Sequence, residues 1–284
     1  MIRLSAFADE ISADLDEQVA VLQSENIQHL DLRSVGGTNV LDLTDQQVMT
    51  IQQTLNKHNI GVACIASPLG KVSIGSPFDT HLKKLARAIE LAHTFQTPFI
   101  RIFSFYPPVL SEEDAESGEF VDPTEWRDEV YKRLKSMTEQ AGAANIMLLH
   151  ENEKDIYGDT ITRCVDLLKR INDSHFQAAF DPANFIQCSQ IPFPDAYEAL
   201  RPWLRYVHVK DALADGTVVA AGEGESHWSD LLQRLHKSGY DGFFSLEPHL
   251  ALAGQFQGFS DPERFRHASQ SFQRLLQAIH WEYE

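Results

Sequence analysis

Short apolar segments alternate with amphipathic segments along almost the whole chain, and this alternation limits the possible folds more than any other feature. Each apolar segment is brief and is bounded by turn-forming or polar residues, which is typical of buried strands. The strands are predicted at residues 4–8, 29–33, 61–67, 99–103, 147–151, 178–181, 206–210 and 243–247. Strands that alternate with helices predict a parallel sheet covered by helices.

The segments between the strands have apolar residues at helical spacing. Helices are predicted at residues 14–25, 79–95, 126–144, 160–170, 229–236 and 262–280. Eight strand–helix units predict a single (β/α)8 TIM barrel over residues 1–284, since such barrels take about 250 residues. The last helix has no strand after it and is expected as a C-terminal extra helix. A doubly wound sheet would place a glycine-rich loop after the first strand, but Ala8, Asp9 and Glu10 follow that strand here.

Four consecutive predicted strands each end on, or close to, a residue that can ligate a divalent metal. These residues are Glu151, Asp181, His208 and Glu247, called the tetrad below. A single acidic residue at a strand end is usually a helix cap or a solvated loop residue. Four in successive units favour a metal site, because equivalent strand ends of a barrel open on one face. Three carboxylates and one imidazole form an oxygen-rich set suited to a hard divalent ion.

This set of residues also suggests a reaction. A divalent ion can polarise a carbonyl and the adjacent hydroxyl of a bound sugar, and so promote loss of the proton between them. Enolate charge would then develop beside the cation. Glu151 and Glu247 are the candidate catalytic residues, because two carboxylates on opposite sides of a ligand can take and return a proton.

Several local motifs resemble the xylose isomerase-like TIM-barrel superfamily, also described as sugar phosphate isomerases and epimerases. The motifs surround the tetrad: His150, Glu151 and Asn152; Phe180, Asp181 and Asn184; His208, Lys210 and Asp211; Glu247, Pro248 and His249. The resemblance covers nearly the whole chain and is strongest over residues 148–250. It implies that the tetrad binds one divalent ion, with Mn²⁺ expected first and Mg²⁺, Co²⁺ or Zn²⁺ as alternatives. It also implies that the two glutamates form the acid/base pair.

The sequence departs from the ketose 3-epimerases of that superfamily at two positions. Many of them have a histidine where this chain has Asn184, and an arginine after the strand-seven histidine where this chain has Lys210. The leading hypothesis is an isomerase or epimerase of a ketose or keto-sugar that acts through a metal-stabilised enediolate. The alternative is a lyase or dehydratase of an inosose or keto-glycoside. An AP endonuclease-like enzyme and a non-catalytic sugar-binding barrel are more remote alternatives.

Five further residues at strand ends are candidate substrate contacts: Asn184, Lys210, His249, Arg33 and Glu10. Each has a structural alternative. Asn184 could cap the following segment, and His249 could simply end its strand. Lys210 could form a salt bridge with Asp211 or Glu223. Arg33 could clamp an anion or a hydroxyl pair of the substrate, or it could pair with Glu10 or Asp9.

Other conspicuous residues have a structural interpretation. Gly222 and Gly224 superficially suggest a phosphate loop, but the glutamates beside them would repel phosphate. They are expected to form a tight turn over the site mouth. Lys71 and His81 are expected at the surface, and residues 107–123 are expected to form a solvated loop.

Charge and composition exclude several classes of protein. The net charge of −17 argues against a nucleic-acid partner, because such partners are bound through basic surfaces. Three cysteines in no metal-type spacing argue against a disulfide framework. No apolar run approaches the roughly 20 residues that span a bilayer, and no signal peptide is recognised. A cytoplasmic protein with a small sugar substrate, and with its terminal helix as a candidate homodimer surface, is expected.

Overall fold

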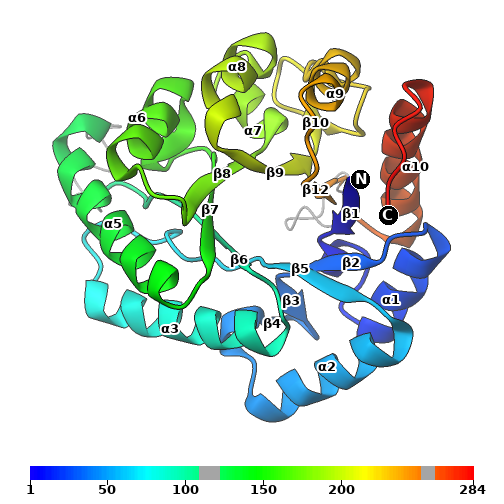
Figure 1. Ribbon diagram of the computed structural model, residues 1–284, viewed down its shortest axis with the longest axis horizontal. Coiled ribbons are helices and arrows are strands. Elements are labelled where there is room, and N and C mark those ends of the chain that lie inside the picture. Colours follow the sequence, from blue (N-terminus) through cyan, green and yellow to red (C-terminus); the bar gives the residue numbers. More distant parts are fainter. Residues whose placement is uncertain (109–121, 251–259) are drawn as a thin grey trace.

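Eight parallel strands form the centre of the molecule, and helices surround them (Figure 1). The computed structural model describes residues 1–108, 122–250 and 260–284. The barrel strands are β1(Arg3–Ala6), β2(His29–Leu32), β5(Gly61–Ile65), β6(Phe99–Ile102), β7(Met147–Glu151), β8(Phe176–Phe180), β9(Leu204–Val209) and β12(Phe243–Leu246). They are hydrogen-bonded in the order β1-β12-β9-β8-β7-β6-β5-β2. β1 and β2 lie beside each other without strand pairing, so the barrel is nearly closed.

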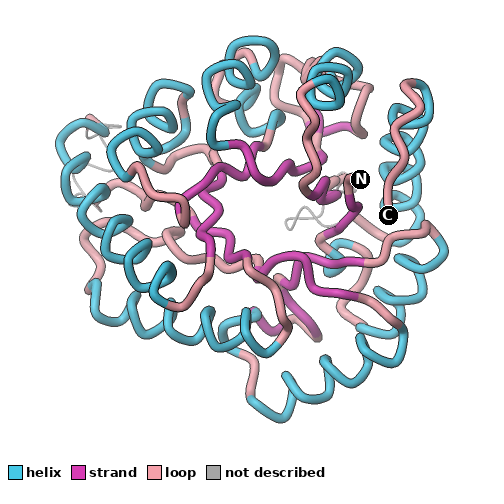
Figure 2. Tube along the Cα trace, viewed as in Figure 1, coloured by secondary structure: helices cyan, strands magenta, loops and turns pink. Residues whose placement is uncertain are grey.

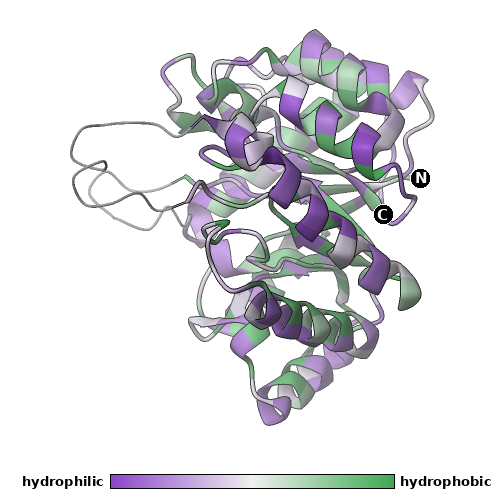
Figure 3. Cartoon of the chain, turned by 90° about the vertical axis from the view of Figure 1, so that its left-hand side faces the viewer, coloured by the Kyte–Doolittle hydropathy of each residue, from purple (hydrophilic) through white to green (hydrophobic). Residues whose placement is uncertain are grey.

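The helices form an outer ring around the strands (Figure 2). They are α1(Leu15–Ser24), α2(Asp45–His58), α3(Phe78–Thr94), α5(Arg127–Ala143), α6(Ile161–Ile171), α7(Pro182–Gln187), α8(Tyr197–Leu200), α9(Trp228–Lys237) and α10(Pro262–Ala278). Hydrophilic and hydrophobic residues alternate around these helices (Figure 3), as expected when one face packs on a barrel. None of the helices described combines the length and apolar character needed to span a bilayer.

The predicted fold is confirmed, and two details are refined. Every predicted strand is present, with ends that differ by a few residues. The terminal helix α10 follows β12, so it is the helix of the eighth unit of the barrel rather than an addition to it. Four further features were not predicted from the sequence. They are α2, the α7–α8 segment, and two small hairpins, β3(Ser34–Val35) with β4(Thr38–Asn39) and β10(Asp211–Ala212) with β11(Val218–Val219).

Side chains that point into the barrel lie in layers, because alternate residues of a strand face the same side. The layer at the amino ends of the strands is aromatic: Phe243 contacts both Phe99 and Tyr206. The middle layer is polar, and there Ser5 and Tyr206 both donate hydrogen bonds to the buried Asp31. The layer at the carboxyl ends contains the tetrad.

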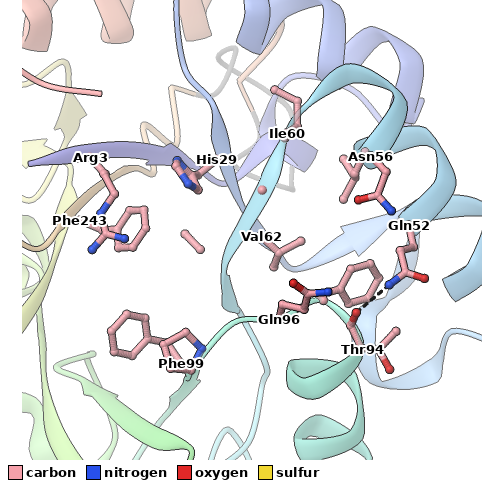
Figure 4. Close-up of a pocket in the computed structure, with 15 residues that line it drawn as sticks. Arg3, His29, Gln52, Asn56, Ile60, Val62, Thr94, Gln96, Phe99 and Phe243 are labelled. Carbon is pink, nitrogen blue, oxygen red and sulfur yellow. Dashed lines mark hydrogen bonds between the residues drawn. The ribbon is translucent and has the colours of Figure 1, made fainter.

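A cavity of about 400 Å³ opens at the amino ends of the strands (Figure 4). The first residues of five strands line it: Arg3, His29, Gly61, Phe99 and Phe243. The Arg3 guanidinium carbon lies 4.0 Å from the centre of the Phe243 ring. This cavity is at the opposite end of the barrel from the tetrad and is therefore not part of the candidate site.

The expected surface position of His81 is wrong. His81 is only 6% exposed, and its Nε2 accepts a hydrogen bond from the backbone N–H of Gly70. The reason is the loop after β5, which folds back over α3. Lys71 is partly exposed and pairs with Glu153 at 2.8 Å. Most of the predicted loop at residues 107–123 lies outside the described residues.

Candidate metal centre

The structure brings the tetrad together at the carboxyl ends of four neighbouring strands. Glu151 is the last residue of β7, Asp181 follows β8, His208 lies in β9 and Glu247 follows β12. All four are buried, and each offers a ligand atom within 4.8 Å of the others. Rigid strands therefore hold the three carboxylates and the imidazole at a common point, as an ion site requires.

Three atoms of the tetrad lack a hydrogen-bond partner among the described residues. Asp181 Oδ2, His208 Nδ1 and Glu247 Oε2 are buried without a hydrogen bond of good geometry. Lys210 Nζ is 2.9 Å from Asp181 Oδ2, but this contact is an ion pair without the angle of a hydrogen bond. Buried polar atoms are normally satisfied, so this donor set fits a divalent cation.

Asp181 also caps a helix. Its Oδ1 accepts the backbone N–H of Asn184 at 2.9 Å, in the first turn of α7. The other oxygen, Oδ2, belongs to the ligand cluster. The capping role expected of an isolated acidic residue and the ligand role are therefore compatible in one side chain.

Neighbouring charges inside the barrel oppose the effect of burial on the pKa values of the tetrad. Burial favours the neutral form of Glu151, but His208 and Arg101 outweigh it and hold its pKa at about 2. Burial also opposes a charge on His208, but Glu151 and Glu247 raise its pKa to about 10. Burial raises the pKa of Asp181 to about 6 against the opposing charge of Lys210. These directions hold without a bound cation, and metal binding would displace the His208 proton.

Glu247 is the most highly connected carboxylate of the site. Burial favours its neutral form, but the charges of Lys210 and His249 help to hold its pKa well below the usual range. The groups within ion-pair distance are Arg33 at 3.0 Å, His249 at 3.3 Å, His208 at 3.4 Å, Arg101 at 3.6 Å and Lys210 at 3.9 Å. A carboxylate with these neighbours remains charged and is held from several sides.

The predicted substrate contacts Asn184 and Lys210 are both engaged with the tetrad. Asn184 Nδ2 donates to Glu151 Oε1 at 3.2 Å and to the Asn152 carbonyl at 2.9 Å. Lys210 pairs with Asp181 and Glu247, whereas the salt bridge predicted as its alternative involved Asp211 or Glu223. Both side chains therefore orient ligand carboxylates in this structure.

Arg33, Glu10 and His249 form a second connected group beside Glu247. Arg33 pairs with Asp9 at 2.8 Å and with Glu10 at 3.3 Å, so the ion pairs predicted as its structural alternative are present. His249 lies between Glu10 at 2.7 Å and Glu247 at 3.3 Å. Burial opposes a charge on His249, but these carboxylates raise its pKa to about 10.

Arg101 was missed in the sequence analysis. It lies in β6, points into the barrel and pairs with Glu151 at 3.1 Å. A signal was available, because Arg101 is the only charged residue within the apolar run 99–103. A buried arginine requires partners, and the tetrad supplies them. His150, the residue before Glu151, is buried against Phe176.

Comparison with known proteins agrees with the fold. The profile of the family described as xylose isomerase-like TIM barrel matches residues 25–275. The 3-dehydroshikimate dehydratase of Bacillus anthracis is 22% identical over 232 residues, which cover 74% of this chain and 78% of that protein.

Solved structures show the same architecture. A D-tagatose 3-epimerase-like protein superimposes with a TM-score of 0.74 and 16% identity, over 98% of each chain. A xylose isomerase-like TIM barrel protein from Mycobacterium smegmatis, in complex with magnesium, has a TM-score of 0.69 and 17% identity over 97% of each chain. At such identities the likeness establishes the fold.

Proposed function

The chain belongs to the xylose isomerase-like TIM-barrel family, and from this premise we propose that it is a divalent-metal-dependent isomerase or epimerase of a ketose or keto-sugar. A fold alone does not define an activity, which depends on the site. The observation that carries the proposal is the buried tetrad, whose ligand atoms lie within 4.8 Å of one another and include three that have ion-pair neighbours but no hydrogen bond of good geometry.

The tetrad would hold the ion through Glu151, Asp181, His208 and Glu247. Mn²⁺ is the first candidate; the magnesium complex of the mycobacterial barrel supports a hard divalent ion more generally. When bound, the ion would polarise the carbonyl and hydroxyl oxygens of the substrate, and so make the neighbouring C–H bond more acidic.

Glu151 and Glu247 are the proposed proton carriers. Both carboxyls are held in the charged form, and this is the form that accepts a proton. In an epimerase one carboxylate would remove the proton beside the carbonyl. The other would first take a proton from its surroundings, which the protonated His249 beside Glu247 can supply, and would then give that proton to the opposite face. Arg101, which contacts both, fixes their relative orientation.

A lyase is the second candidate, and two observations favour it. The Bacillus anthracis relative is named as a dehydratase. In addition, His249 is partly exposed beside Glu247 and carries a proton at neutral pH. Elimination needs a base for the C–H proton and an acid for the departing oxygen, and Glu247 with His249 would supply this pair.

Deuterium exchange tests the proposal directly. The protein, loaded with Mn²⁺ or Mg²⁺, is incubated in D₂O with a panel of ketoses, keto-glycosides and inososes. We expect deuterium beside the carbonyl by NMR, with an isomeric product for an epimerase and loss of water or an aglycone for a lyase. No exchange with any member of the panel would contradict the proposal.

Glu247→Gln tests the proposed base. We expect exchange to fall about 100-fold or more, the size of contribution typical of a positioned acid or base. The matched control is Glu223→Gln, which changes an exposed carboxylate whose partner is His267. Equal activity of the two variants would show that Glu247 is not a proton carrier.

A further inference from the structure

We infer that the substrate of this site carries no anionic group, so that an uncharged polyhydroxy ketone is preferred over a sugar phosphate or a carboxylated ring. This inference rests on the proposed function and narrows its substrate class. Two observations at the carboxyl ends of the strands support it. Each buried cationic side chain there is already paired with a carboxylate of the chain, and a cluster of backbone N–H groups there already binds one.

The buried cations of the catalytic face are all engaged by carboxylates of the chain itself. Among the described residues, Arg101 pairs with Glu151, and Lys210 pairs with Asp181. Arg33 and His249 each contact both Glu10 and Glu247. A substrate phosphate or carboxylate would have to break one of these pairs and leave another buried charge uncompensated, which is costly.

Two lysines at the rim of the site, Lys71 and Lys154, are also poor candidates for binding an anionic substrate. Lys71 pairs with Glu153 at 2.8 Å. Lys154 is exposed on the loop after β7 and lies between Glu153 and Asp155 in the sequence. Exposed charges of this kind are screened by solvent and contribute little to binding.

The loop after β9 contains an anion-binding arrangement that is already filled. In β/α barrels the loops after the seventh and eighth strands frequently bind phosphate. Here β9 is the seventh strand of the barrel in chain order, and Asp211 follows it. The Asp211 carboxylate accepts the backbone N–H groups of Gly222 at 2.9 Å, Gly224 at 3.0 Å and Ser226 at 3.0 Å.

Asp211 therefore occupies the position that an anion would take in a nest of backbone N–H groups. The approach is so close that a Cβ at position 224 would collide with the Asp211 carboxylate, which explains the glycine there. The tight turn predicted for Gly222 and Gly224 thus folds around a carboxylate of the chain.

The segments outside the described residues add no cation. Residues 109–121 and 251–259 contain no lysine, arginine or histidine in their sequence, and the first of them has five acidic residues. Among the described residues, an anionic substrate would therefore meet no buried cation of the catalytic face that is without a carboxylate partner in the chain.

Matched substrate pairs test the inference. Calorimetry of the Mg²⁺-loaded protein at constant ionic strength compares D-fructose with D-fructose 6-phosphate, and an inosose with 3-dehydroshikimate. We expect the uncharged member to bind about tenfold more tightly or better, a difference of about 1.4 kcal/mol. Equal or tighter binding of the charged members would overturn the inference.

The same pairs distinguish this inference from the proposed function. Exchange that is fastest with a phosphorylated or carboxylated ketone would overturn the inference and leave the proposed function intact. Binding that favours the uncharged members, without exchange on any, would support the inference and contradict the proposed function. If neither the uncharged nor the charged members bind, both the inference and the proposed function are contradicted.

Asp211→Ser tests the filled nest. ³¹P NMR should show that the wild-type protein does not bind inorganic phosphate at this loop, whereas Asp211→Ser does. The matched control is Asp215→Asn on the same loop, where the carboxylate accepts the backbone N–H of Thr217. Phosphate binding by the wild type that competes with a ketose would overturn the inference, as would an Asp211→Ser variant that folds but gains no phosphate affinity.

Discussion

Arg101 connects the interior of the barrel to the candidate site. Its guanidinium is buried between the rings of Phe7 and Phe103, with centroid distances of 4.8 and 5.0 Å. From there it reaches Glu151 and Glu247. Two glutamates that face a common point repel each other, so a fixed cation beneath them is needed to keep both charged.

We expect Arg101→Met to destabilise the metal-free protein by about 3 kcal/mol or more, because a buried ion pair that loses one partner leaves an uncompensated charge. Urea unfolding measures this change. A divalent ion should reduce the loss, since it supplies positive charge to the same carboxylates. Arg87→Met is the control, with an expected cost below about 1 kcal/mol, because its partner Asp45 is exposed. Similar losses in both variants would contradict a supporting role for Arg101.

The sequence allowed prediction of the tetrad and of several residues beside it, but not of Arg101 or of most contacts with the ligand carboxylates, for a physical reason. Each tetrad member ends or lies near the end of an apolar strand, and the barrel rule converts that position into proximity. The partners of Lys210, and the contact of Arg33 with Glu247, depend on side-chain reach across different strands. Asp211 was predicted only as a salt-bridge partner of Lys210, because nothing in its neighbourhood shows that distant N–H groups will surround it.

At the level of elements, the loop after β5 is held against α3 by one histidine. Gly70 adopts a φ of +89° and leaves no room for a Cβ beside Phe103. Its N–H donates to His81 Nε2, so His81 must be neutral to accept this bond. Burial, with the nearby charge of Arg133, lowers the pKa of His81 to about 4.

This contact predicts a pH dependence. The folded pKa of His81 is below its unfolded value, so its contribution to stability is complete above about pH 6.5. The contribution is lost as the pH falls from about 6.5 towards 4, because the unfolded state then binds more protons. Chemical unfolding at several pH values should show a smaller loss over this interval in His81→Gln than in the wild type. His93→Gln, an exposed substitution on the same helix, should keep the wild-type slope. A wild-type slope in His81→Gln would contradict the assignment.

The elements that could not be predicted have few apolar residues or depend on distant contacts. α2 buries only Val48, Ile51 and Leu55 within 14 residues, so its apolar face is narrow. The α7–α8 segment is interrupted around Phe193, which removes the helical periodicity. The hairpins contain two residues per strand, too few to display an alternating pattern.

At the level of the whole molecule, side chains close the gap between β1 and β2. Ser5 on β1 and Tyr206 on β9 donate to Asp31 on β2. Burial raises the pKa of Asp31 against the charge of His208 and these hydrogen bonds. The closing contact of the barrel is therefore one carboxyl group rather than a backbone ladder.

We expect Asp31→Ala to accelerate amide hydrogen exchange in β1 and β2, because Ser5 and Tyr206 lose their acceptor. Exchange in β7 and β8, on the paired side of the barrel, should change less. Asp31→Asn keeps an acceptor oxygen and is the matched control. Unchanged exchange in β1 and β2 of Asp31→Ala would show that packing alone closes the barrel.

The crowded surroundings of Glu247 have a consequence for how such a site can diverge. Five basic side chains lie within ion-pair distance of this one carboxylate. Arg101 is also the partner of Glu151, but loss of any one of the other four still leaves four basic side chains around Glu247, so the charge of this carboxylate stays compensated while its direction can change. Such redundancy would let a lineage retune the position of its base in single steps without passing through an unfolded intermediate.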